Sequence, residues 1–298
     1  MIINRLQHSE IDFLKWDTTI LKSTIPFVFA QSYYLNATCP NWEALIIGDY
    51  ESVFPLTQNT KFGISYLYQP PFTPQLGVYG KINTQIEETF FNYLSSHYKF
   101  IDIELNASNT FISKEHSKKT TYFIDYKNGY QLNQNTKRNI TKAVELNLTF
   151  ERIIDSEIID LSKSYLNPFL SKTLNLSQAT IQKFEILLKE AIHNHALYSF
   201  KVVDRNNNVK AIAHFISNGK HTVYLKGTNF DKSENTGSMH YLTHSAIQFF
   251  ETRSLYFDFG GGSKESLATF YKGFGSLPLD YNVLKFNKLP WLLKLFKN

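Results

Sequence analysis

The chain has few of the residues that mark small extracellular or disordered proteins. Its 298 residues include a single cysteine, Cys39, so no disulfide can form within the chain. The 13 glycines and 9 prolines are too few for a low-complexity segment. No apolar run approaches the roughly 20 residues of a membrane-spanning helix, and the first residues lack the apolar core of a signal peptide. We therefore expect a folded, cytoplasmic protein.

Charge of one sign is also limited. Lys and Arg number 31 against 26 Asp and Glu, a formal net charge of +5, which is well short of the dense basic clusters of a dedicated duplex-DNA binder. The mild excess favours an anionic partner that is not duplex DNA. Aromatic residues are abundant, with 25 Phe and 18 Tyr. The length suits one large domain or two domains of about 150 residues each.

Helix and strand patterns occur in the same order in the two halves of the chain. A basic helix at 133–147 separates the halves, and a repeat of about 145 residues indicates duplicated domains and not a solenoid. We predict an N-terminal domain at 1–127, a bridging helix segment at 128–147 and a C-terminal domain at 148–298. Expected strands of the first half are 1–6, 42–48, 53–56, 64–68, 100–105 and 122–126, with 42–48, 53–56 and 64–68 forming a meander. Those of the second half are 148–153, 197–203, 209–217, 221–228, 255–259 and 283–286. Expected helices include 84–98, 156–170, 177–193 and 238–253, with Ser9 capping a helix near the N-terminus.

The stretch 255–281 has the clearest pattern. An apolar strand ends at Gly260–Gly262, Ser263 is a candidate N-cap, and a short helix ends at glycines 273 and 275. We expect its four phenylalanines to pack in the core: Phe257, Phe259, Phe270 and Phe274. Lys272, in the last helical turn, can answer the helix dipole or reach toward an anionic ligand.

Three segments resemble the FemABX aminoacyl transferases and related FemAB-like proteins. They are TKRNITKA at 136–143, TVYLKGT at 222–228 and FDFGGGSKESLATFYKGFG at 257–275. The resemblance implies an α/β fold with mixed sheets, built as two tandem GNAT-like (acyl-CoA N-acyltransferase) domains. It also implies transfer of an acyl or aminoacyl group to an amine of an anionic acceptor, such as a peptidoglycan precursor in cell-wall synthesis.

The donor stays open between acyl-CoA and aminoacyl-tRNA, with no covalently bound cofactor expected. GNAT enzymes hold the pyrophosphate of coenzyme A in an R/Q-x-x-G-x-G/A turn at the start of a helix. In the second half this position has Gly237 alone, and the first half lacks the turn as well. We therefore expect no acetyl-CoA bound in the usual way. The coiled-coil insertion that serves tRNA in the family has no counterpart here.

Four basic residues are the candidate site residues. The resemblance places Lys272 near the transferred acyl group, where an ammonium stabilises the oxyanion of acyl transfer; the alternative is a solvated lysine at a helix end. Lys137 and Arg138 belong to a basic cluster that can bind anionic groups, or can be a solvated helix face. Lys226, near a strand end, is a second candidate for anion binding, or protects a sheet edge.

Other chemistry is less supported. His240 and His244 have the i, i+4 spacing of a zinc pair, but no Glu lies between them and no third ligand is evident, so we expect no metal. His214 on a strand is expected to be a satisfied buried partner, and no catalytic base is identified. Because both phosphate turns are missing, the alternative function is a non-catalytic ligand-binding module on a degenerate tandem GNAT fold.

The C-terminal segment 283–298 combines a strand with a basic aromatic tail. We expect residues 283–286 to close the second sheet and Pro290 to open a final helix. Trp291, Leu292 and Leu295 can pack on their own domain, or the tail can dock on anionic lipid through two lysines worth about 1 kcal/mol each. Burial of three apolar side chains contributes more, so packing is favoured over membrane-surface contact.

Overall fold

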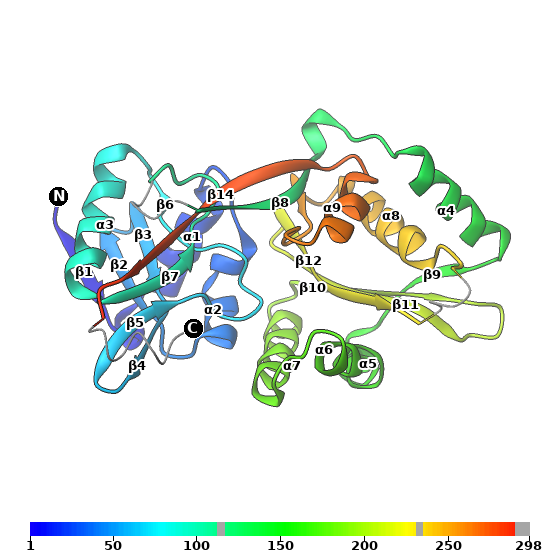
Figure 1. Ribbon diagram of the computed structural model, residues 1–298, viewed down its shortest axis with the longest axis horizontal. Coiled ribbons are helices and arrows are strands. Elements are labelled where there is room, and N and C mark those ends of the chain that lie inside the picture. The colour runs from blue at the N-terminus through cyan, green and yellow to red at the C-terminus, as the bar shows by residue number, and fades with distance from the viewer. Residues whose placement is uncertain (112–116, 231–234, 290–298) are drawn as a thin grey trace. The chain divides into compact units, whose positions relative to one another are not determined.

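The chain forms two compact units, which the computed structural model describes over residues 1–111, 117–230 and 235–289 (Figure 1). Unit 1 comprises Met1–Thr120 and Asp280–Asn298, and unit 2 comprises Thr121–Leu279. Each unit has its own apolar core. The basic helix predicted as a bridge lies within unit 2, as α4 (Gln134–Glu145), and the chain returns to unit 1 at residue 280.

Unit 1 contains a four-stranded antiparallel sheet in the order β1-β2-β3-β6. Its strands are β1 (Ile3–Leu6), β2 (Glu43–Ile47), β3 (Ser52–Leu56) and β6 (Tyr79–Gly80). The first helices are α1 (Phe13–Lys22) and α2 (Ser32–Thr38). The prediction that Ser9 caps the first helix is wrong. Residues His8–Glu10 form a separate 3-10 turn, and α1 begins later because the Asp12 carboxylate accepts a hydrogen bond from the backbone N–H of Lys15.

A second group of strands in unit 1 corrects the predicted meander. It contains β4 (Gln58–Lys61), β5 (Ile64–Tyr68) and β7 (Phe100–Glu104). β5 pairs antiparallel with β4 and parallel with β7, and does not join β2 and β3. The polar strand β4 was not predicted, because QNTK lacks the apolar alternation of a strand. Phe62 and Gly63 both have positive φ, as a two-residue hairpin turn requires.

Residues 283–286 were predicted to close the second sheet, and in the last strand, β14 (Leu277–Asn287), they pair with a strand of unit 1. β14 pairs antiparallel with β7 of unit 1, with Val283 opposite Glu104 and Leu284 opposite Ile103. Leu284 is buried in the unit 1 core, against which α3 (Thr84–His97) also packs. The apolar pattern predicted a strand here but could not tell which sheet receives it. The predicted tail helix from Pro290 lies outside the described residues.

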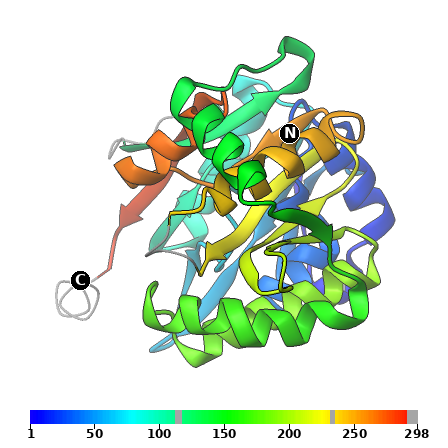
Figure 2. The same ribbon diagram turned by 90° about the vertical axis from the view of Figure 1, so that its right-hand side faces the viewer.

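Unit 2 is built on a sheet in the order β8-β13-β12-β11-β10-β9. Its strands are β8 (Ser117–Asp125), β9 (Thr149–Arg152), β10 (Leu197–Val203), β11 (Val209–Ser217), β12 (His221–Asn229) and β13 (Tyr256–Asp258). Helices α5 (Asp155–Leu161), α6 (Asn167–Lys172) and α7 (Gln178–His193) cover one face of the sheet. Helices α4, α8 (Ser238–Glu251) and α9 (Glu265–Lys272) cover the other face (Figures 1 and 2).

The sheet of unit 2 opens between its two parallel strands. β12 and β13 pair over three positions only, the last being Val223 opposite Asp258. Beyond this point β12 continues to Asn229, whereas the segment that follows β13 turns away at Gly260–Gly262. A register shift opposite β11 leaves Leu225 as the extra residue of a β-bulge, which bends the strand further. The gap between β12 and β13 therefore results from their short pairing and from the β-bulge.

Among the described residues, none of the helices combines the length and the apolar character needed to cross a membrane.

Candidate functional site

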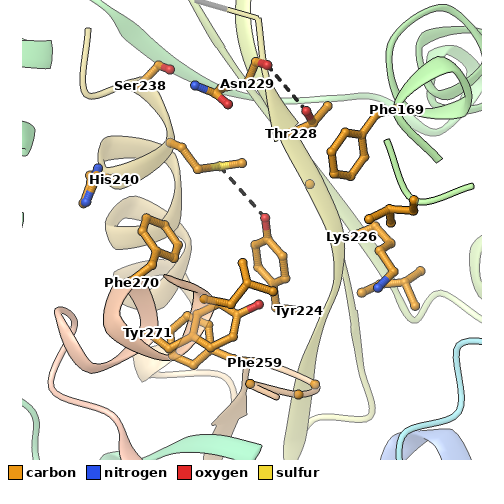
Figure 3. Close-up of a pocket in the computed structure, with 18 of the residues that line it drawn as sticks. Phe169, Tyr224, Lys226, Thr228, Asn229, Ser238, His240, Phe259, Phe270 and Tyr271 are labelled. Atoms are coloured by element: carbon orange, nitrogen blue, oxygen red, sulfur yellow. Dashed lines mark hydrogen bonds between the residues drawn. The ribbon is translucent and has the colours of Figure 1, made fainter. Parts of the chain in front are cut away.

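A cavity of about 450 Å³ lies in unit 2 where β12 and β13 separate (Figure 3). Four parts of the unit supply its walls: the second half of β12, the first turn of α8, the glycine turn after β13, and one face of α9. Side chains from α6 and the residues after it complete the lining. Labelled in Figure 3 are Phe169, Tyr224, Lys226, Thr228, Asn229, Ser238, His240, Phe259, Phe270 and Tyr271.

The β12 wall combines an aromatic side chain with main-chain groups. Tyr224 lies along the strand, and its hydroxyl donates to Met239 Sδ at 3.9 Å. A Cβ atom on Gly227 would lie 2.2 Å from that hydroxyl, so only glycine at this position leaves room for the Tyr224 side chain. Because pairing with β13 ends at Val223, the backbone groups of residues 224–228 in β12 have no ladder partner on that side among the described strands. These N–H and C=O groups are available to a ligand.

The glycine turn opposite β12 is fixed from beneath by a buried carboxylate. Asp258 accepts hydrogen bonds from Thr121 Oγ1 at 2.6 Å and from the backbone N–H of Gly260 at 2.8 Å. The backbone N–H of Gly261 donates to Thr121 Oγ1 at 3.1 Å. His221 Nε2 lies 3.3 Å from the other carboxylate oxygen of Asp258, and both side chains are fully buried. Asp258 therefore positions the turn and is not exposed to a substrate.

The amino end of α8 supplies a third wall. Gly237 is left-handed (φ 78°), and a Cβ there would lie 2.1 Å from the carbonyl oxygen of Asn139 in α4. The helix has no side-chain cap at Gly237; the backbone N–H of Ser238 donates to Thr236 Oγ1 at 3.3 Å, and the next N–H groups of the first turn have no side-chain acceptor among the described residues. Ser238 is 1% exposed, and its hydroxyl has no hydrogen-bond partner in the described part of the chain. A helix amino end of this kind favours an anionic or carbonyl oxygen.

Of the four predicted site residues, the structure places Lys226 in the cavity lining. It is half-buried, and burial lowers the pKa of its ammonium group below the ordinary value. The described residues offer it no hydrogen bond or ion pair. Phe169 lies at the same end of the cavity (Figure 3), and Leu174 is also part of the lining. The alternative role, protection of a sheet edge, also stays a prediction, because β12 at Lys226 pairs with β11 on one side but extends beyond its pairing with β13 on the other.

The other three predicted residues lie outside the described lining. Lys272 is exposed at the end of α9, with its Nζ atom 5.6 Å from the centre of the Tyr122 ring, although the preceding residue, Tyr271, lines the cavity. Lys137 and Arg138 are exposed on α4, where Arg138 Nη2 donates to Asn135 Oδ1 at 2.9 Å. Their predicted roles therefore stay predictions.

The α9 segment partly confirms the sequence analysis. Phe257, Phe259 and Phe274 are buried core residues, as predicted. Phe270 is only partly buried and faces the cavity. Ser263 is not the N-cap, since Lys264 takes that position without a side-chain bond. Gly273 is the C-cap, as predicted, but it has right-handed helical geometry, which does not require glycine. The close packing of Gly273 against Thr136 explains the glycine instead, because a Cβ would lie 2.4 Å from Thr136 Oγ1.

His240 is a lining residue that the sequence analysis considered only as a metal ligand. Its ring packs edge-on against Phe270, with centroids 4.9 Å apart, and burial lowers its pKa below the ordinary value. The described residues contain no group of three potential metal ligands. The sequence feature that could have indicated His240 as a lining residue was its position at the start of a helix, three residues after Gly237. At neutral pH this imidazole is uncharged and can accept a proton.

His214 is a satisfied buried residue, as predicted. Its Nε2 and Nδ1 atoms lie 2.7 Å from the hydroxyl oxygens of Ser162 and Ser199. Full burial lowers its pKa to about 3. Ser162 begins a π-helical turn, η4 (Ser162–Leu166), between α5 and α6. Since both ring nitrogens are occupied by hydroxyls, His214 has a structural role in positioning the α5–α6 segment over the sheet.

Comparison with solved structures defines the class of fold. A tandem GNAT protein from the clavulanic acid biosynthesis pathway matches with a TM-score of 0.51 and 7% identity, over 97% of this chain and 99% of that one. The chain therefore has a tandem GNAT fold.

Within that class, the fold is FemABX-like. FemX matches over 100% of both chains with a TM-score of 0.70 and 11% identity. The DUF2156 domain of a proposed lysylphosphatidylglycerol synthetase from Agrobacterium fabrum matches over 96% of this chain and 95% of that one, with a TM-score of 0.58 and 10% identity. No protein-family model matches the sequence, and no curated protein does.

Proposed function

We propose that the protein is an acyltransferase or aminoacyltransferase that uses the unit 2 cavity to hold the acyl group and transfers it to an amine. The observation that carries this proposal is the cavity at the separation of β12 and β13, with unpaired main-chain groups on one side and a helix amino end beside it. The acceptor is an amine on an anionic molecule in the cytoplasm, of which a peptidoglycan precursor is one example.

The chemistry follows from the groups around the cavity. The amine nitrogen attacks the acyl carbonyl carbon, a C–N bond forms, and the bond to the donor's sulfur or oxygen breaks. Charge that develops on the carbonyl oxygen is stabilised by N–H groups of β12 and of the first turn of α8. Among the described lining residues, His240 is an uncharged base that accepts the proton lost by the amine. Lys272 is proposed to add positive charge near the oxyanion.

The donor is proposed to be an acyl-CoA or an aminoacyl-tRNA that is not held by the usual pyrophosphate turn. The first turn of α8 has Gly237 as its single glycine, in place of the glycine-rich turn of ordinary GNAT enzymes. Lys137 and Arg138, exposed on α4, are proposed to bind anionic groups of the donor or the acceptor. No covalently bound cofactor and no metal is part of the proposal.

A panel of donors tests the proposal. The protein is incubated with acyl-CoA thioesters and with charged tRNAs, each with amine acceptors that include peptidoglycan precursors, and products are detected by mass spectrometry. We expect amide formation with one donor class, and a loss of about 100-fold in kcat for His240→Gln. An absence of transfer with every donor would contradict an enzymatic role.

The second candidate is a non-catalytic ligand-binding module. It is favoured by the absence of the usual phosphate turn at α8, since a fold that has lost its donor site can retain a ligand cavity. Binding of a donor or acceptor to the cavity without any transfer in the same panel would support this candidate over the enzyme.

A further inference from the structure

The two ends of the cavity differ in chemistry. One end is formed by α8, whose N–H groups and Ser238 hydroxyl suit an oxygen acceptor. The other end lies toward α6 and combines the apolar side chain of Phe169 with the ammonium group of Lys226 (Figure 3); Leu174, which follows α6, is also part of the lining. A group that extends from the strand separation into this second end therefore meets an aliphatic and aromatic surface first and a positive charge beside it.

Lys226 has no counter-charge in the described structure. Neither Asp nor Glu occurs among the described lining residues. Its cross-strand neighbour on β11 is His214, whose two ring nitrogens already contact Ser162 and Ser199. An ammonium group removed from water without a partner is unfavourable. The cost is offset when a ligand brings an anionic group to it, because such a pair forms charge-assisted hydrogen bonds.

We propose that this end of the cavity selects a substrate group that carries a carboxylate on a short apolar chain, with Lys226 as the specificity-determining residue. This inference rests on the proposed function and names the substrate class of the same site. Because the Lys226 end is continuous with the strand separation, the carboxylate belongs to the transferred acyl group, as in a dicarboxylic acyl or an acidic aminoacyl group. A carboxylate on the acceptor has the same chemistry, and the experiment separates the two sources.

Pairs of donors whose acyl groups have the same number of carbon atoms but differ in charge test the assignment. We compare succinyl-CoA with butyryl-CoA, and glutamyl-tRNA with glutaminyl-tRNA, using each acceptor in its carboxylate and carboxamide forms. The wild type is expected to prefer the charged acyl group by 10-fold or more in kcat/KM. The preference should vanish in Lys226→Met and remain in Lys201→Met, a control in which the lost lysine pairs with Glu151 on neighbouring strands.

The outcomes decide between the sources. Preference for the charged acyl group, removed by Lys226→Met, supports the proposal. Preference that follows the acceptor's carboxylate instead assigns Lys226 to the acceptor and overturns the acyl assignment. Equal rates for charged and neutral donors, or a preference unchanged in Lys226→Met, overturn the role of Lys226, while the transfer itself still supports the proposed function.

A binding measurement makes the inference independent of turnover. Lysine 13Cε–1Hε NMR signals are recorded during titration with glutarate and with its uncharged diamide, glutaramide, and the Lys226 signal is identified by its loss in Lys226→Met. Glutarate is expected to shift this signal saturably and glutaramide is not. If glutarate binds there but no donor is turned over, the proposed function fails and the carboxylate site stands. If glutarate does not shift the signal, or glutaramide shifts it equally, the carboxylate site is wrong.

Discussion

His214 shows how burial and hydrogen bonding fix one protonation state. Both ring nitrogens contact serine hydroxyls, and no carboxylate is among their hydrogen-bond partners. Burial lowers the pKa of His214 to about 3, below that of a solvated histidine. The unfolded chain therefore binds a proton here between pH 6.5 and pH 3, whereas the folded chain does not. The stability from neutral His214 is complete above about pH 6.5 and is lost as the pH falls.

We predict that the free energy of unfolding decreases by about 3 kcal/mol more between pH 7.5 and pH 4.5 in the wild type than in His214→Gln, because two pH units below the unfolded pKa correspond to roughly this amount. Urea unfolding monitored by circular dichroism at each pH provides the measurement. His214→Gln keeps a polar side chain but cannot titrate. Equal losses in the two proteins would show that His214 does not contribute.

Lys272 tests the residue-level assignment drawn from the family resemblance. It is exposed and lies over the Tyr122 ring, one residue from the cavity lining. If it stabilises the oxyanion, Lys272→Ala should lower kcat about 100-fold, the size of effect seen when one oxyanion donor is removed. Lys264→Ala removes an exposed lysine at the start of the same helix and should leave the rate unchanged. Full activity of Lys272→Ala would remove the catalytic assignment.

The position of Lys226 was predictable and its environment was not. Alternation of apolar residues places it near the end of a strand, but the β-bulge at Leu225 and the early end of β12–β13 pairing decide that it borders a cavity. Both depend on pairing with distant strands, which local patterns do not encode. His240 was missed as a lining residue because helical spacing shows which residues share a face, not what that face meets.

At the scale of elements, the close approach of α8 to α4 depends on Gly237. A Cβ there would lie 2.1 Å from Asn139 O, and the left-handed φ adds strain for any other residue. We predict that Gly237→Ala destabilises the protein by about 2 kcal/mol or more and weakens donor binding, because α8 must move. Gly219→Ala is the control, since Gly219 has a similar φ of 81° but no atom within 4 Å of the added Cβ.

Thermal unfolding and donor binding by calorimetry would measure both effects. Equal destabilisation by the two substitutions would attribute the cost to backbone strain alone and contradict the close-contact explanation.

Elements with strong periodicity were predicted and those set by distant partners were not. The helix capped by Ser177 begins where expected, and strands β10 and β11 have their predicted bounds. The start of α1 was misplaced because Asp12 competes with Ser9 as the cap. Strand β4 lacks any apolar alternation, so its existence depends on pairing with β5.

At the scale of the whole molecule, the return of β14 to unit 1 makes a distinct prediction. Leu284 is buried in the unit 1 core beside β7, whereas Leu277, in the same strand, is 70% exposed. Leu284→Ala should cost about 2–5 kcal/mol, and Leu277→Ala close to nothing.

Hydrogen exchange read by mass spectrometry locates the effect. Amides of β7 (Phe100–Glu104) should exchange faster in Leu284→Ala, while those of β11 (Val209–Ser217) stay protected. Faster exchange in β11 with no change in β7 would restore the predicted placement of this strand in the second sheet.

Much of the tandem order of elements was predicted from the sequence, since it repeats along the chain and most elements have local signals, but strands β4 and β6 were not. The pairing of the last strand could not be predicted, because an apolar strand pattern does not indicate which strand it pairs with. For the site, the sequence indicated the right segment, 257–275, and one lining lysine, but the cavity itself arises from the parting of two strands.

The most direct test of the account is transfer activity when the cavity is narrowed at its rim. Leu267 lines the cavity and is 43% exposed, so Leu267→Trp adds bulk there without disturbing the core. Leu277→Trp adds the same bulk at an exposed position outside the described lining. With the donor identified by the panel, we predict that Leu267→Trp lowers kcat/KM at least 10-fold and that Leu277→Trp does not. Equal activity of both variants and the wild type would contradict transfer at the β12–β13 cavity.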